Sequence, residues 1–146
     1  MQTIAVLYIN ISGEGIKEKD IDVLLNAIQS NNNITTLYFI ADHMTHKHIE
    51  SIKNLLISNC MKKFWLEGNL ITDNDILSLS AIIADNDHLT VLSISGKQLG
   101  FAALAAIAKN LKQNTTLINL SLKLDLLFFE DAKKIVFQLT FTVRSA

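Results

Sequence analysis

The sequence predicts an α/β fold, a right-handed solenoid with an inner parallel sheet of about five strands and helices outside it. Three observations lead to this prediction. A short apolar pattern recurs five times along the 146 residues at nearly equal intervals. Between these patterns, apolar residues change to a helical spacing. The chain also has no proline, so its turns depend on the clusters of asparagine, aspartate and glycine that separate the two kinds of segment.

The recurring pattern, apolar-x-x-apolar-x-apolar, predicts the strands. Its starts lie 30, 27, 28 and 28 residues apart. A period in this range is typical of solenoids and repeat arrays. We therefore expect residues 1–146 to form a single domain of five repeats, starting near residues 4, 34, 61, 89 and 117. The five triplets are Ile4/Leu7/Ile9, Ile34/Leu37/Phe39, Met61/Phe64/Leu66, Leu89/Leu92/Ile94 and Leu117/Leu120/Leu122.

Apolar residues with helical spacing follow each triplet, and we expect one helix per repeat. Thr45 can cap the second helix, and Thr72 or Asp73 the third. The polar clusters at 30–33, 85–87 and 113–115 should end the helices. The expected buried stripes are Ile21/Leu24/Leu25/Ile28, Ile49/Ile52/Leu56, Ile76/Leu79/Ile83, Phe101/Leu104/Ile107/Leu111 and Ala132/Ile135/Val136/Leu139.

Element lengths explain how such units stack. A strand of five or six residues and a helix of eleven or twelve both span roughly 17 to 20 Å, so each repeat restores the chain direction. Successive strands then pair in parallel, and β-α-β connections of this kind are almost always right-handed. Strands pack about 4.8 Å apart and helices about 8 to 10 Å apart, which places the strands on a concave inner side.

The fourth unit, residues 89–111, reads LTVLSISGKQLGFAALAAIAKNL. It resembles the leucine-rich repeat family, in particular the ribonuclease-inhibitor-like class with its 28-residue helical unit. The resemblance implies a horseshoe arc and covers almost the whole chain. It also implies that Asn69 ties one turn to the next. The equivalent positions are Ser12, Asp42, Lys97 and Asp125, and because lysine cannot accept a hydrogen bond, we expect the ladder to be imperfect at Lys97.

Charge and composition limit the classes of partner that we expect and the cellular compartment. The 13 basic and 14 acidic residues give a net charge of −1, which argues against nucleic acid and anionic membranes as partners. The single cysteine, Cys60, fits a reducing compartment. No signal peptide or membrane span is visible, so we expect a cytoplasmic protein. Arg144 is the single arginine among many lysines, which suggests an AT-rich genome. Leucine-rich repeat proteins of intracellular bacteria look similar, so delivery into a host cell, as a bacterial effector, is the alternative location.

The candidate binding site is the concave face of the sheet. Residues between the second and third triplet positions should point there, and in the first three repeats they are Tyr8, Tyr38 and Trp65, with Lys63 and Glu67 beside Trp65. Tyrosine and tryptophan are enriched at binding hot spots, and the resemblance implies that protein ligands bind at such positions. We therefore expect a non-enzymatic module that binds a protein partner. The alternative is cross-strand packing that only stabilises the sheet.

A second candidate interface lies in the last unit. It carries apolar residues beyond one helical stripe: Phe128, Phe129, Phe137 and Phe141. These either form a hydrophobic cap or make the chain an assembly unit that self-associates as a homo-oligomer through uncapped hydrophobic ends. Five strands offer a concave face of only about 400 Å², about half of what a standard interface needs from each partner. Three explanations would account for the difference: the binding is weak, loops and edges contribute, or the solenoid is longer than this chain, through self-association or because the chain is a fragment.

Nothing in the sequence indicates catalysis or a cofactor. It contains no nucleophile elbow, phosphate-binding loop or dinucleotide-binding motif, so we expect no enzyme and no cofactor. His43, His46 and His48 cluster near one turn, but they lack the i, i+4 spacing of a helical metal site. We expect them to be surface residues of a turn rather than metal ligands.

Overall fold

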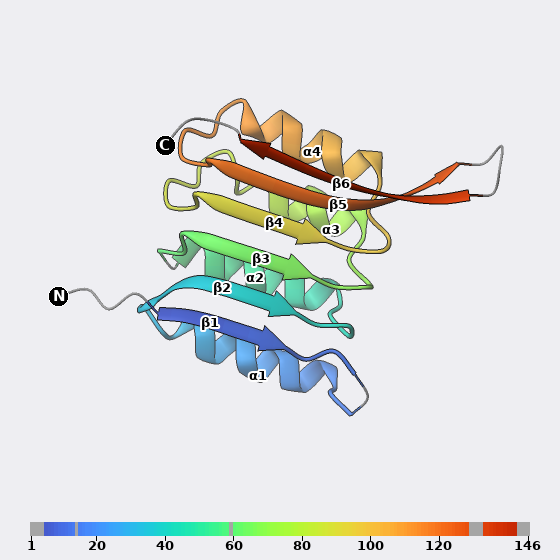
Figure 1. Ribbon diagram of the computed structural model, residues 1–146. Helices are drawn as coiled ribbons and strands as arrows, with labels where there is room; N and C mark the ends of the chain where they lie inside the picture. The colour runs from blue at the N-terminus through green and yellow to red at the C-terminus, as the bar shows by residue number, and fades with distance from the viewer. Residues whose placement is uncertain (1–4, 14, 59, 129–132, 143–146) are drawn as a thin grey trace.

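The computed structural model describes residues 5–13, 15–58, 60–128 and 133–142. Strands and helices alternate through the first four units, which confirms the predicted α/β alternation there (Figure 1). Four of the predicted strands are followed by a helix, and the fifth is followed by another strand. The elements are β1 (Ala5–Asn10), α1 (Glu18–Gln29), β2 (Ile34–Ile40), α2 (His46–Ser58), β3 (Lys63–Glu67), α3 (Asp73–Ser80), β4 (Val91–Ser95), α4 (Phe101–Leu111), β5 (Asn119–Phe128) and β6 (Lys133–Thr142).

All six strands belong to one sheet, in the order β1-β2-β3-β4-β5-β6. The first five are parallel, and β6 runs antiparallel to β5. Helices α1 to α4 lie together on one face of this sheet, and no described element covers the other face of β1 to β4 (Figure 1). We call this second face the open face.

The core lies between the sheet and the helices. The triplet residues of the second to fifth repeats are buried as expected. The helices contribute Ile21, Leu25, Ile49, Ile52 and Ile76, each at most 1% exposed. Apolar burial of this kind supplies the main stabilising free energy of the fold.

The fourth helix departs from the expected stripe. Phe101, its first residue, is 65% exposed, and Ala103, Ala106 and Ile107 are the buried residues. Leu99, two residues before the helix, is 1% exposed and takes the interior place. The helix therefore presents small alanines to the core, and Phe101 is a surface aromatic.

The fifth helix was predicted wrongly, because residues 133–142 form β6, which pairs with β5 over ten residues. The segment reads KKIVFQLTFT. Apolar Ile135, Phe137, Leu139 and Phe141 occupy every second position, and β-branched and aromatic residues favour strands. The helical spacing of Ile135, Val136 and Leu139 coexists with this period of two. A strand pairing with β5 satisfied the backbone groups along that side of β5, which a helix could not have done.

Side chains at the third residue of each helix cap three of the four N-termini. The backbone N–H of Lys17 donates to Asp20 at 2.8 Å, and that of Thr72 donates to Asp75 at 2.9 Å. Thr72 is the N-cap of α3, as expected. Asp73 instead accepts a hydrogen bond from the backbone N–H of Gly100 at 2.7 Å, so it caps the helix of the next unit.

Two side-chain hydrogen bonds link the turns that follow β2, β3 and β4. Asn69 Nδ2 donates to Asp42 Oδ1 at 2.7 Å. At the next unit Lys97 is exposed, and its neighbour Gln98 donates through Nε2 to the carbonyl oxygen of Asn69 at 3.3 Å. The connection expected to fail at Lys97 is thus made one residue later.

Candidate functional site on the open face of the sheet

The strand register places the candidate residues side by side. Tyr8 pairs with Tyr38, and Tyr38 pairs with Trp65, on three adjacent strands. Ser93 and Ser121 continue the same line on β4 and β5. The alternation of buried and exposed residues along each strand directs these side chains to the open face. We call Tyr8, Tyr38 and Trp65 the aromatic row.

The rings of the aromatic row contact one another. The ring centroids of Tyr38 and Trp65 lie 4.2 Å apart with an interplanar angle of 14°, which is a stacked pair. Those of Tyr8 and Tyr38 lie 5.7 Å apart at 42°. Mutual contact limits the rotamers that the rings can adopt, so little side-chain entropy remains to be lost on binding.

The open face has a step between β3 and β4. Trp65 has Tyr38 on one side and Ser93, a much shorter side chain, on the other. A ring beside a serine keeps part of its second face accessible, and Trp65 is accordingly only half-buried. At the other end of the row, Tyr8 is 62% exposed. A partner can therefore contact the row both from above and from the serine side.

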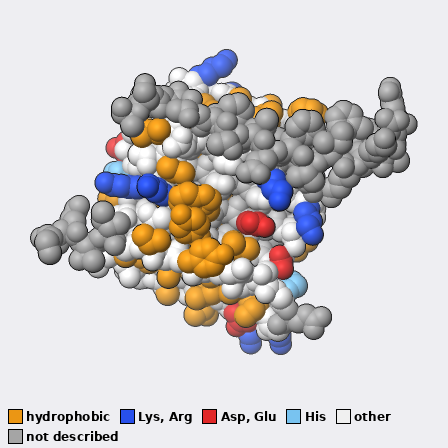
Figure 2. Space-filling model, viewed as in Figure 1, with side chains coloured by type: hydrophobic (Ala, Val, Ile, Leu, Met, Phe, Trp, Pro, Cys, Tyr) orange, Lys and Arg blue, Asp and Glu red, His pale blue; other side chains and the backbone are white. Residues whose placement is uncertain are grey.

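Charged residues flank the row along β3. Lys63 and Glu67 lie two residues before and after Trp65, on the same face, and both are exposed. Neither side chain forms an ion pair or side-chain hydrogen bond with any residue in the described part of the chain. Figure 2 shows hydrophobic side chains gathered in the middle of this face, with lysine and acidic side chains near their margins. The pattern is an apolar centre with a polar rim, as in protein interfaces.

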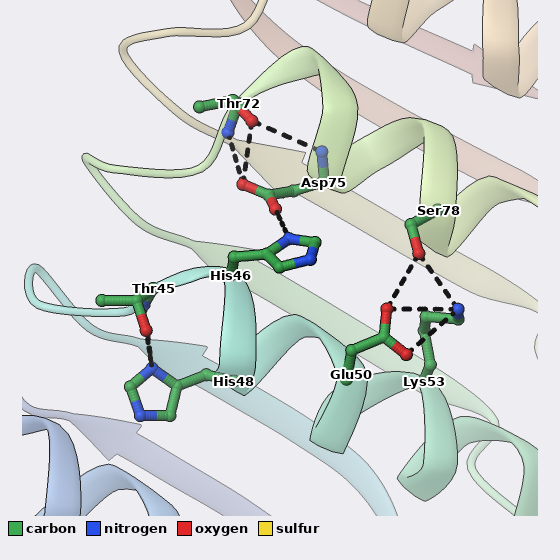
Figure 3. Close-up of polar contacts among 8 residues, drawn as sticks. All are labelled: Thr45, His46, His48, Glu50, Lys53, Thr72, Asp75 and Ser78. Carbon is green, nitrogen blue, oxygen red and sulfur yellow. Dashed lines mark hydrogen bonds and ion pairs between the residues drawn. The ribbon is translucent and has the colours of Figure 1, made fainter.

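The histidines have structural contacts instead (Figure 3). His48 is 1% exposed, so the expectation that it lies on the surface is wrong. The backbone N–H of Thr45 donates to His48 Nδ1 at 2.8 Å, and His48 Nε2 donates to the carbonyl oxygen of Glu18 at 3.0 Å. Since α2 begins at His46, the His48 ring caps the N-terminus of α2 and links this helix to α1.

His46 joins the starts of α2 and α3. Its Nδ1 lies 2.7 Å from Oδ1 of Asp75, while the other carboxylate oxygen of Asp75 accepts hydrogen bonds from the backbone N–H and hydroxyl of Thr72. Among the described residues, no three histidine, cysteine or acidic side chains converge as metal ligands do. His43 is exposed.

A polar cluster on the helical side links α2 with α3. Ser78 Oγ donates to Glu50 Oε1 at 3.1 Å, and Lys53 Nζ lies 3.3 Å from Glu50 Oε2 (Figure 3). The hydrogen bond from Ser78, followed by the contact with Lys53, holds the pKa of the Glu50 carboxyl below its ordinary value. The cluster lies on the layer opposite the aromatic row and has a structural role.

The phenylalanines of the last unit do not share a helical face. Phe137 and Phe141 lie on β6, opposite Leu124 and Leu120 of β5, and Phe128 is the last residue of β5. Phe129 lies outside the described residues. The hairpin extends the sheet to six strands, two of them ten residues long. The sheet is therefore wider than the five short strands on which the estimate of about 400 Å² rests.

Two asparagines missed at the sequence level connect the repeats at the turns that follow the helices. Asn114, 4% exposed, donates through Nδ2 to the carbonyl oxygen of Ile83 at 2.7 Å and accepts at Oδ1 from the backbone N–H of Leu117 at 2.7 Å. Asn86 donates through Nδ2 to the carbonyl oxygen of Leu56 at 3.3 Å and accepts from the backbone N–H of Leu89 at 2.7 Å. The 28-residue spacing of the two asparagines, each three residues before a triplet, was the signal available in the sequence.

Comparison with known proteins bears mainly on the fold. No protein-family model matches the chain, and no curated protein matches it. Among solved structures, the chain is similar to the leiomodin-1 actin-binding site 2 (ABS2), with a TM-score of 0.65 and 25% sequence identity. The match covers 82% of this chain and 71% of that one. In the described part of the chain, no helix has the length and apolar character needed to cross a membrane.

Proposed function

We propose that this chain is a non-enzymatic protein-binding module of the leucine-rich repeat type, similar to the ribonuclease-inhibitor-like class, which binds its partner through the open face of the sheet. The single observation that carries the proposal is the aromatic row. Both tyrosines and the single tryptophan of the chain lie in contact on one uncovered face. Tyrosine and tryptophan give large contact areas at low entropic cost, and truncating such residues at interfaces commonly costs more than about 2 kcal/mol.

The surroundings of the row support binding over packing alone. Cross-strand packing accounts for the ring contacts within the row, but it does not account for the exposure of Tyr8, which is 62% exposed at the edge of the sheet. The free charges of Lys63 and Glu67 give a partner polar contacts at the rim, where they favour specificity and association rate.

Actin is the first partner to test. The similar solved structure is an actin-binding site, and a protein that binds through the same fold offers a reasoned starting point. The proposal about the open face does not depend on actin, because fold similarity alone does not fix a ligand. The proposal includes a location in the cytoplasm or, after delivery, in a host cell. Identification of the partner would distinguish these two locations.

The test compares Trp65→Ala with Phe101→Ala for binding of monomeric actin to the immobilised chain. Both substitutions remove an accessible aromatic, but Phe101 lies at the start of α4 in the helical layer. Trp65→Ala should weaken binding about thirtyfold, equivalent to about 2 kcal/mol, and Phe101→Ala should leave it unchanged. Equal affinities for the two variants would rule out the open face.

If actin does not bind the wild-type chain, the wild type and the double variant Tyr38→Ala/Trp65→Ala are compared in a pull-down from lysate. The captured protein is then identified and purified, and the affinity measurement is repeated with it. A partner captured equally by wild type and by the double variant Tyr38→Ala/Trp65→Ala would contradict the proposed site.

A further inference from the structure

The first strand is a sheet edge without the usual protection. In the described part of the chain, β2 lies on one side of β1 and no strand lies on the other. Its sequence, AVLYIN, contains no charge and no proline, the residues that proteins commonly use to prevent pairing at edges. The one register shift falls between Ala5 and Val6, so the strand from Val6 to Asn10 is regular.

Burial along the sheet shows that this edge lacks a neighbour. Leu7 and Ile9 of β1 are only partly buried. Their counterparts in the other parallel strands are each at most 1% exposed. These counterparts are Leu37, Phe39, Phe64, Leu66, Leu92, Ile94, Leu120 and Leu122. Because each internal unit is covered on both sides, the difference marks apolar surface that a further strand and helix would cover.

The backbone of β1 directs a second set of hydrogen-bonding groups outward. The N–H groups of Ala5 and Ile11 donate to the carbonyl oxygens of Asn33 and Ile40, so odd-numbered residues face β2. Alternate residues of a strand point their backbone groups to opposite sides. The N–H and C=O groups of Val6, Tyr8 and Asn10 therefore face away from the sheet, where another strand can pair with them.

We propose that β1 pairs antiparallel with β1 of a second copy across a twofold axis at Tyr8. In this register Tyr8 exchanges two hydrogen bonds with the second copy's Tyr8, and Val6 pairs with the second copy's Asn10. Leu7 lies opposite the second copy's Ile9 on the core side. The aromatic row becomes continuous through both copies, because Tyr8 stands at its end.

Symmetry and charge favour a second copy as the occupant. A twofold pairing joins one surface to itself and closes, whereas pairing of β1 with the β6 edge of another copy would generate an open-ended polymer. No charged residue in β1 opposes its symmetric mate. Both helical layers stay on one face of the joined sheet, so α1 and its Val23, 68% exposed, lie next to the second copy's α1.

The size of the contact sets the expected strength. A six-residue strand is about 20 Å long, and a sheet with one helical layer is roughly 20 Å deep, which gives on the order of 400 Å² per copy. The total of about 800 Å² falls below the range of stable complexes. We therefore expect a weak dimer, seen as a concentration-dependent shift in sedimentation velocity between about 1 µM and about 1 mM.

The first test compares Tyr8→Lys with Ser93→Lys in sedimentation velocity. Both positions lie in one row of the open face, but Tyr8 is at the edge and Ser93 is on the central strand β4. Tyr8→Lys places like charges opposite each other across the axis and should lower the association constant at least tenfold. Ser93→Lys should associate as the wild type does. A wild type that stays monomeric throughout, or equal association by both variants, overturns the proposal.

The second test determines the register by oxidative crosslinking in a Cys60→Ser background. Tyr8→Cys places two thiols across the axis at a Cα separation of about 5.5 Å, within the range for a disulfide. Val6→Cys places them about 14 Å apart, from the four-residue offset along the strand and the spacing between strands. A disulfide dimer of the first variant alone supports the register, and equal crosslinking of both refutes it. Neither test involves a partner protein, so the result is independent of the proposed function.

Discussion

Replacing Asn114 with alanine should destabilise the fold more than any surface substitution. Its Oδ1 accepts from the backbone N–H groups of Thr116 and Leu117 at 3.0 and 2.7 Å, and its Nδ2 donates to the carbonyl oxygens of Ile83 and Asn86 at 2.7 and 3.1 Å. Each intramolecular hydrogen bond contributes about 1 kcal/mol net, and the alanine leaves buried backbone groups without that partner. Two of the four hydrogen bonds, those to Asn86 and Thr116, are only partly buried, and water can replace the lost partner there, so we expect a loss of about 3 kcal/mol.

The assay is urea unfolding monitored by circular dichroism, with Asn54→Ala as control. Asn54 is exposed in α2, and alanine there should be neutral or stabilising by a few tenths of a kcal/mol. Asn114→Ala should lower the unfolding midpoint without changing the slope, because the surface exposed on unfolding stays the same. A loss below about 1 kcal/mol would refute the view that this asparagine joins the repeats.

Two further predictions concern the links between α1, α2 and α3. His48→Ala should cost about 2 to 3 kcal/mol in urea unfolding, because it removes the bonds to Thr45 and Glu18; an unchanged midpoint would contradict the role assigned to the ring. For Glu50, the lowered pKa means that its contribution to stability is present above the pKa of the unfolded state and is lost as the pH falls through the folded-state pKa. Glu50→Gln should therefore reduce the loss of stability of the wild type below about pH 4, and identical pH profiles for the two proteins would argue against the contacts with Ser78 and Lys53.

The sequence predicts the parallel part of the fold because the repeat carries two signals, the apolar triplets and their regular spacing. The triplets place the strands, and the 27- to 30-residue spacing aligns them, so the register of Tyr8, Tyr38 and Trp65 follows directly. The prediction of a fifth helix is wrong because the segment 133–142, KKIVFQLTFT, fits both a helical period and a strand period. Only pairing with the free side of β5, a long-range interaction, decides between them.

The candidate site is predictable for the same reason, and the interior polar contacts are not. Outward positions follow from alternation along a strand, so the aromatic row could be identified in advance. The burial of His48 depends on the placement of α1 beside α2, and Phe101 is exposed because Leu99 occupies the interior place before the helix. These outcomes depend on packing between elements, which local sequence patterns do not contain.

The most direct test of the central claim uses Trp65, the single tryptophan of the chain, as a reporter. With 5-fluorotryptophan incorporated, the ¹⁹F NMR spectrum contains one resonance, which comes from the aromatic row. If the open face binds the partner, adding the unlabelled partner, actin first, should shift or broaden this resonance in proportion to the bound fraction. A complex verified by sedimentation that leaves the resonance unchanged at saturation would show that the partner binds elsewhere.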